Sequence, residues 1–248
     1  MVASFTSAGV LGLLALGLVF GLKHATEVDH VVAVSAIVSE HRSVFRSALV
    51  GGLWGVGHTT SLMVVGVVVL VFRAAIPVPV ANWLEFGVAL MIIGLGLLAM
   101  TRVLRRRSDV HLHKHSHDGV PHVHIHFHES TTPHVQDQPS THTHAVSSIG
   151  VKPLLIGTMH GLAGSGALTL LVLTQIKSVW LGLLYIAIFG LGSIVGMLLM
   201  SGLIGLPFAL TSRNLSGLHH RLQTTAAGLS IAFGLWYAYQ TGLASGLL

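Results

Sequence analysis

The sequence has no cysteine and very little charge. Only 8% of its 248 residues are Asp, Glu, Lys or Arg, whereas 52% are hydrophobic. The absence of cysteine excludes disulfides, thiolate metal sites and cysteine nucleophiles, so any metal must be held by nitrogen and oxygen atoms. Soluble domains usually carry about a quarter charged residues, so this composition indicates a membrane protein, in agreement with a mean hydropathy of +0.78.

Two sequence motifs of energised pumps and metalloproteases are also absent. Without a P-loop, any coupling to ATP would need a partner protein. Without H-E-x-x-H, an intramembrane metal-dependent hydrolase with Glu27 as its base is the least favoured class, and we expect a non-enzymatic protein without a cofactor. The net charge of +5 is interpreted as membrane topology and not as nucleic-acid binding.

Apolar segments long enough to cross a bilayer, which takes about 20 helical residues, occur six times. They span residues 5–38, 47–72, 80–104, 150–176, 180–207 and 222–246. The first has 34 residues and would reach about 51 Å as a straight helix, so it must tilt, break or project from the membrane. We predict an all-α polytopic membrane protein with six transmembrane helices and a broken first helix.

Basic residues divide unevenly between the two sides that six spans create. Ten lie in the loops after spans one, three and five, whereas the opposite side has only Arg73 and Lys177. Because cytoplasmic loops carry the excess of Lys and Arg, we expect these loops in the cytoplasm and both termini outside, in the bacterial inner membrane.

The two halves of the chain resemble each other. "GLKH", ending at His24, matches "GTMH", ending at His160, and 160 − 24 = 136. Gly57 and Gly192 lie in similar glycine-rich stretches, and 192 − 57 = 135. Three spans per half would invert the second copy, as in transporters that bind substrate between repeats; coincidence between glycine-rich helices is the alternative. We expect three-helix halves at 1–107 and 148–248.

The loop at 108–147 is rich in histidine. It holds eleven of the 18 histidines among Ser, Thr, Pro and Asp, without core-forming periodicity. This composition predicts a disordered cytoplasmic loop that buffers metal or passes it to a cytoplasmic acceptor, although "HVHIHFH" alternates like a strand and could form a hairpin on metal binding. The expected buffering residues are His111, His113, His115, His117, His122, His124, His126 and His128.

The stretch "GLKHATEVDH" places polar side chains inside the first span. His24, Glu27, Asp29 and His30 offer imidazoles and carboxylates that suit a divalent transition metal. A regular helix would point His24 and Asp29 about 140° apart, so a shared ion requires a local break. Irregular backbone is tolerated at membrane depth where it is buried in protein or lines a cavity. Projection of this stretch into water is the alternative.

Two further histidines lie in polar, glycine-rich parts of later spans. His58, followed by Thr59 in "GGLWGVGHTTS", could complete the metal site. His160, in "HGLAGSGALTL" with Ser165, could add a ligand or line the ion path. For both histidines the competing interpretation is a hydrogen bond that only packs helices together.

The spacing H-x4-D-H of His24, Asp29 and His30, after "GLKHA", resembles the signature of the nickel/cobalt transporter family. "GHTT" at 57–60 is similar to that family's second histidine motif, and the layout resembles its shorter six-span bacterial members. The resemblance implies Ni²⁺ or Co²⁺ as transported substrate and these three residues with His58 as the selectivity site. Ligand chemistry alone would also admit zinc or copper. Uptake is the leading hypothesis, and the same residues fit efflux.

Overall fold

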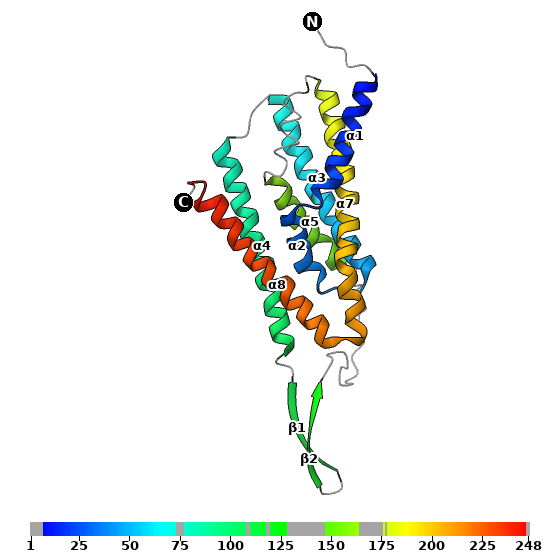
Figure 1. Ribbon diagram of the computed structural model, residues 1–248, viewed down its shortest axis with the longest axis vertical. Coiled ribbons are helices and arrows are strands. Elements are labelled where there is room, and N and C mark those ends of the chain that lie inside the picture. Colours follow the sequence, from blue (N-terminus) through cyan, green and yellow to red (C-terminus); the bar gives the residue numbers. More distant parts are fainter. Residues whose placement is uncertain are drawn as a thin grey trace.

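The structure is a computed structural model with helices on each of the six apolar segments (Figure 1). It describes residues 7–72, 77–107, 110–117, 120–127, 147–163, 176 and 178–246. The elements, in chain order, are α1 (Ser7–His24), α2 (Val28–Val38), α3 (Val44–Phe72), α4 (Val78–Arg107), β1 (Val110–His117), β2 (Val120–Phe127), α5 (Ser147–Leu162), α7 (Val179–Asn214), α8 (Ser216–Ala238) and the π-helical turn η2 (Tyr239–Leu243).

Three of these helices, α3, α4 and α7, are long and apolar enough to cross a membrane, and α1 with α2 makes a fourth candidate if the bent pair is one span. Helix α5 has 16 residues, short for a complete span, and α8 begins with a polar turn that includes Arg221. The predicted class of all-helical membrane protein is therefore confirmed. Six spans remain a prediction.

The predicted break in the first span is confirmed. Helix α1 ends at His24, α2 begins at Val28, and the two axes differ by 51°. The backbone N–H groups of Thr26 and Glu27 donate to the carbonyls of Lys23 and His24, at 2.9 and 3.1 Å, which closes the end of α1. The break turns the start of α2 to a new direction, and so changes where its first side chains point.

Helix α3 lies centrally, packed against α5 and α7; α1 packs on α7, and α4 pairs with α8 (Figure 1). Glycine permits the closest approaches. A Cβ atom at Gly57 of α3 would lie 2.2 Å from the carbonyl oxygen of Leu154 in α5. One at Gly192 of α7 would lie 2.4 Å from that of Leu18 in α1. Small residues let membrane helices approach in this way and gain van der Waals contact.

Side-chain hydroxyls and an amide also join the helices. Ser61 of α3 donates to the Thr158 carbonyl of α5 at 2.7 Å, and Ser230 of α8 donates to the Val32 carbonyl of α2 at 3.0 Å. Gln223 Nε2 donates to the Ser39 carbonyl, directly after α2, at 2.8 Å. Such bonds stabilise membrane helix pairs by about 1 kcal/mol each. They fix α2 against α8 and α3 against α5.

The histidine-rich loop contains an antiparallel hairpin, β1–β2, that extends from one end of the helices (Figure 1). The sequence favoured disorder here, with a hairpin only on metal binding. The two-residue period of the H-x-H pairs is that of a β-strand, which explains the difference. Residues 128–146, with His128, lie outside the described residues. The register aligns His111 with His126, His113 with His124, and His115 with His122.

Candidate metal site

Four histidines and one aspartate meet at the break between α1 and α2. His24 ends α1, Asp29 and His30 lie in the first turn of α2, His58 lies in α3, and His160 lies near the end of α5. All five are buried, with relative exposures between 0% for His58 and 9% for Asp29. The structure thus brings together the four residues expected to form the site, and adds His160.

The Asp29 carboxylate holds two of the imidazoles. Its Oδ1 atom accepts from Nδ1 of His30 at 3.0 Å, and its Oδ2 atom accepts from Nε2 of His160 at 2.9 Å. An ionised carboxylate only accepts hydrogen bonds, so these ring nitrogens carry the protons. The opposite nitrogens, His30 Nε2 and His160 Nδ1, are buried and lack hydrogen-bond partners among the described residues. Their lone pairs are available to an ion, with Asp29 orienting the rings as carboxylates orient metal-binding histidines elsewhere.

His24 and His58 form a second pair. Their Nε2 atoms lie 2.9 Å apart, and His24 Nδ1 lies 3.1 Å from Oε1 of Glu27. Because Glu27 accepts, we assign the His24 proton to Nδ1, and His24 Nε2 then accepts from Nε2 of His58. His58 Nδ1 has no partner among the described residues. An ion that binds both Nε2 atoms must therefore displace or move one proton.

The cluster contains two overlapping triads, His24–His30–His58 and Asp29–His30–His160. The candidate ligand atoms of each triad all lie within 4.8 Å of one another. Two nitrogens that bind one ion at about 2.1 Å are at most about 4.2 Å apart, so small side-chain movements would close either triad. Two divalent ions about 5 Å apart would repel by about 13 kcal/mol at an effective dielectric constant of about 20. The cluster therefore suits one ion at a time, with His30 common to both positions.

Aromatic rings cover the cluster. Trp54 is fully buried, and its ring centroid lies 5.5 Å from that of His160 and 6.4 Å from that of His30. Phe189 lies 5.6 Å from His24 by the same measure. These walls exclude water and strengthen electrostatic interactions inside the site. The sequence analysis did not identify Trp54, although it precedes His58 by one helical turn and so lies on the same face of α3.

The remaining predicted site residues have other positions. The Glu27 side chain is 43% exposed and forms the rim of the cluster. The Thr59 hydroxyl donates to the Gly190 carbonyl at 3.2 Å, so it joins α3 to α7. Ser165 lies outside the described residues. For the loop histidines of β1 and β2, only the backbone is described.

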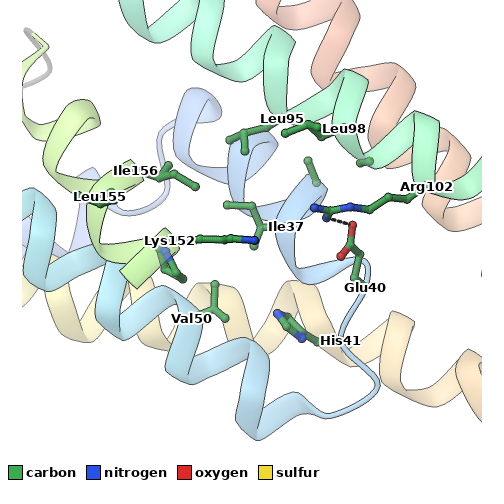
Figure 2. Close-up of a pocket in the computed structure, with 13 residues that line it drawn as sticks. Ile37, Glu40, His41, Val50, Leu95, Leu98, Arg102, Lys152, Leu155 and Ile156 are labelled. Carbon is green, nitrogen blue, oxygen red and sulfur yellow. Dashed lines mark hydrogen bonds and ion pairs between the residues drawn. The ribbon is translucent and has the colours of Figure 1, made fainter. Parts of the chain in front are cut away.

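A separate cavity of about 520 Å³ opens near the ends of α2 and α4 and the start of α5 (Figure 2). The Glu40 carboxylate forms an ion pair with Arg102 at its edge, and Lys152 extends into it. The cluster histidines are not among its lining residues. Two basic side chains against one carboxylate do not suit a divalent cation. The buried cluster is therefore the stronger candidate for metal.

No protein-family model and no solved structure matches the chain. The urease accessory protein UreH from Bacillus sp. (strain TB-90) is 36% identical to it over 238 residues, which cover 96% of this chain and 95% of that protein. The relative is named as an accessory to an enzyme, and the function implied for this chain is related to nickel or cobalt transport and is not enzymatic. This similarity along both chains, together with the buried His/Asp cluster, shows that the chain belongs to the nickel/cobalt transporter family.

Proposed function

We propose that the chain carries Ni²⁺ into the cytoplasm across the bacterial inner membrane, with Co²⁺ as the chemically similar alternative. The observation that carries this proposal is the buried set of four imidazoles and one carboxylate at a break in a membrane helix. Imidazole nitrogen suits nickel and cobalt, and buried ionisable groups in a membrane mark ion paths. A relative named for assisting urease favours inward movement, because an accessory transporter supplies metal to an enzyme inside the cell.

In this mechanism the ion loses its water shell as it enters the cluster. His24, His30 and His58 bind it first, through nitrogen atoms next to the exposed Glu27. His30 then keeps its hold while His160 replaces His24 and His58. Asp29 orients His30 and His160 and balances part of the ion's charge. A shared ligand lets the ion move between positions without becoming fully uncoordinated, which lowers the barrier between them.

We further propose six spans with both termini outside, so that the loop at 108–147 lies in the cytoplasm. The excess of basic residues in the loops after spans one, three and five supports this orientation. The hairpin β1–β2 connects α4 to α5 at one end of the helices, opposite the start of α1 (Figure 1). Histidines in this loop would receive the ion and deliver it to a cytoplasmic metal acceptor.

The helix contacts support an inverted repeat of the halves 1–107 and 148–248. Gly57 of α3 meets the Leu154 carbonyl of α5, and Gly192 of α7 meets the Leu18 carbonyl of α1. The offsets are 192 − 57 = 135 and 154 − 18 = 136, which match the offset of 136 between His24 and His160. The contact of α3 with α5 is thus repeated by that of α7 with α1. This agreement does not follow from glycine content alone.

Uptake of ⁶³Ni by cells that express the chain tests the proposal. We expect accumulation above the empty-vector control, and its loss in the double variant His24→Ala/Asp29→Ala. Accumulation below the vector control would show efflux, in which the same site and loop load the ion for export. Flux that is unchanged in the double variant would exclude this site.

A further inference from the structure

One carboxylate within a membrane helix remains outside the cluster. Glu85 lies seven residues after Val78, the first residue of α4, and therefore about 10 Å along the helix. It belongs to a candidate span, and its side chain is partly buried. Ionisable groups within spans are costly and usually face a path or a partner, so each requires an explanation.

Tyr237 of α8 holds this carboxylate. Its hydroxyl donates a hydrogen bond to Glu85. Tyr237 also lies within electrostatic range of Glu27 and Asp29, and Glu85 lies within electrostatic range of Asp29. Three carboxylates, from α4, from the break and from α2, therefore surround one phenol beside the cluster. The pair of helices that supplies Glu85 and Tyr237 lies next to α2 in Figure 1.

A purely structural role for Glu85 would be to tie α4 to α8. That contact is already close without it, because a Cβ atom at Gly96 of α4 or at Gly234 of α8 would lie within 3 Å of the opposing helix. A neutral side chain could accept the same hydrogen bond from Tyr237. A structural role therefore does not require the negative charge, which needs a cationic partner.

The neighbouring cluster provides an independent indication that this partner is the metal ion. His30 Nε2 is an unpartnered polar atom on a side chain that is 1% exposed, and it lies beside the Asp29 carboxylate within reach of Glu85's charge. Glu27 connects the two regions through its contact of 3.1 Å with His24. Carboxylate oxygens suit a hydrated divalent ion, whereas imidazole nitrogens suit the dehydrated transition metal. Oxygen ligands thus precede nitrogen ligands from the rim inward.

We propose that Glu85, positioned by Tyr237, receives the hydrated divalent metal ion and passes it through Glu27 to the His/Asp cluster. This inference rests on the proposed transport function. Tyr237 engages one carboxylate oxygen of Glu85, which leaves the other available to the ion or its water. By lining the approach with negative charge, Glu85 raises the local concentration of the cation and its rate of capture. It acts on entry and not on the affinity of the cluster.

Purified full-length chain in proteoliposomes tests this separation of entry from binding. Initial ⁶³Ni flux is measured across a range of Ni²⁺ concentrations, and equilibrium Ni²⁺ binding is measured by calorimetry in detergent. For Glu85→Gln we expect the half-saturating concentration to rise about tenfold, with the saturating rate and the equilibrium affinity changed less than about threefold. Glu85→Asp, which keeps the charge, should restore most of the difference.

Two controls make the result decisive. Tyr237→Phe removes the hydrogen bond and keeps the carboxylate, so it should have a smaller effect on half-saturation than Glu85→Gln. Glu40→Gln removes a carboxylate that is paired with Arg102 instead and should leave half-saturation unchanged. Half-saturation unaffected by Glu85→Gln, or equal effects of Glu85→Gln and Tyr237→Phe, would overturn the proposal. Normal flux in His24→Ala/Asp29→Ala would instead overturn the proposed transport site.

Discussion

The Nε2 atoms of His24 and His58 lie 2.9 Å apart although 34 positions separate the two residues. One nitrogen of this pair carries a proton that an incoming metal ion must displace. Binding of a metal through both rings is therefore coupled to proton movement, and affinity must fall as protons compete for the same lone pairs. The hydrogen bond also holds both side chains near the positions that a shared ion would require.

Loss of one ring from this pair should weaken metal binding. We expect His58→Ala to lower Ni²⁺ affinity by at least about 100-fold, because it removes a buried nitrogen donor and leaves a cavity beside His24. Calorimetry on purified protein measures the change. His220→Ala, outside the cluster, is the matched control and should retain the original affinity. Equal affinities of the two variants would contradict a role for His58 in binding.

Removal of the Asp29 charge should disturb two rings at once. Asp29→Asn keeps the size of the side chain, but its amide can accept from only one of His30 and His160 through oxygen. We expect Ni²⁺ affinity to fall about 10- to 100-fold, as for other carboxylates that orient metal-binding histidines. Wild-type affinity in this variant would show that neither ring depends on the carboxylate.

Close packing of α3 on α5 predicts a loss of stability when Gly57 gains a methyl group. The new Cβ atom would lie 2.2 Å from the Leu154 carbonyl oxygen, so the helices must separate. We expect Gly57→Ala to lower the free energy of unfolding by about 1–3 kcal/mol, as overpacking does. Thermal unfolding in detergent measures this change. Gly87→Ala on α4, with nothing within 4 Å of the new atom, should be neutral or stabilising.

The loop between α2 and α3 predicts sensitivity to acid. Burial lowers the pKa of His41 below its ordinary value of 6.5; Glu40 raises it in part, and Arg46 lowers it further. The unfolded chain therefore binds this proton more readily than the folded chain, and stability falls as the pH drops through 6.5. We expect His41→Gln to reduce the loss of thermal stability between about pH 7 and pH 5. A loss of the same size in the variant would contradict this assignment.

The histidine-rich loop should modulate transport without being required for it. Deletion of residues 111–144 leaves the buried cluster intact, so we expect ⁶³Ni flux to continue with altered capacity or regulation. Flux in proteoliposomes, compared with that of the full-length chain, measures the difference. Complete loss of flux in a folded, membrane-inserted deletion variant would place an essential ligand in the loop.

The local features of the fold could be predicted from sequence because each one breaks a pattern. The overlong first segment and its polar insertion predicted the break at residues 25–27, and the cost of buried charge predicted His24, Asp29 and His30 as site residues. The H-x-H alternation allowed the hairpin, but the polar composition of the loop was given more weight than its period.

The contacts between distant segments could not be predicted in the same way. Nothing in the spacing shows that Asp29 holds His160, because helix packing decides which faces meet. Trp54 matches the apolar character of its helix and so carries no signal of a role. Glu85 did carry one, as a charged residue within a span, but its relation to the cluster depends on how α4 and α8 lie beside α2.

The hydrogen bond between Asp29 and His160 also bears on how the protein is made. The ribosome synthesises Asp29 131 residues before the histidine that donates to its second oxygen. Until α5 enters the membrane, that carboxylate lacks this partner in a medium that penalises unpaired charge. The first half alone is thus an incomplete assembly, and arrival of α5 completes both the site and the electrostatic balance of α2. Quality control that detects unpaired charge in membranes could therefore distinguish a finished chain from a truncated one by this single contact.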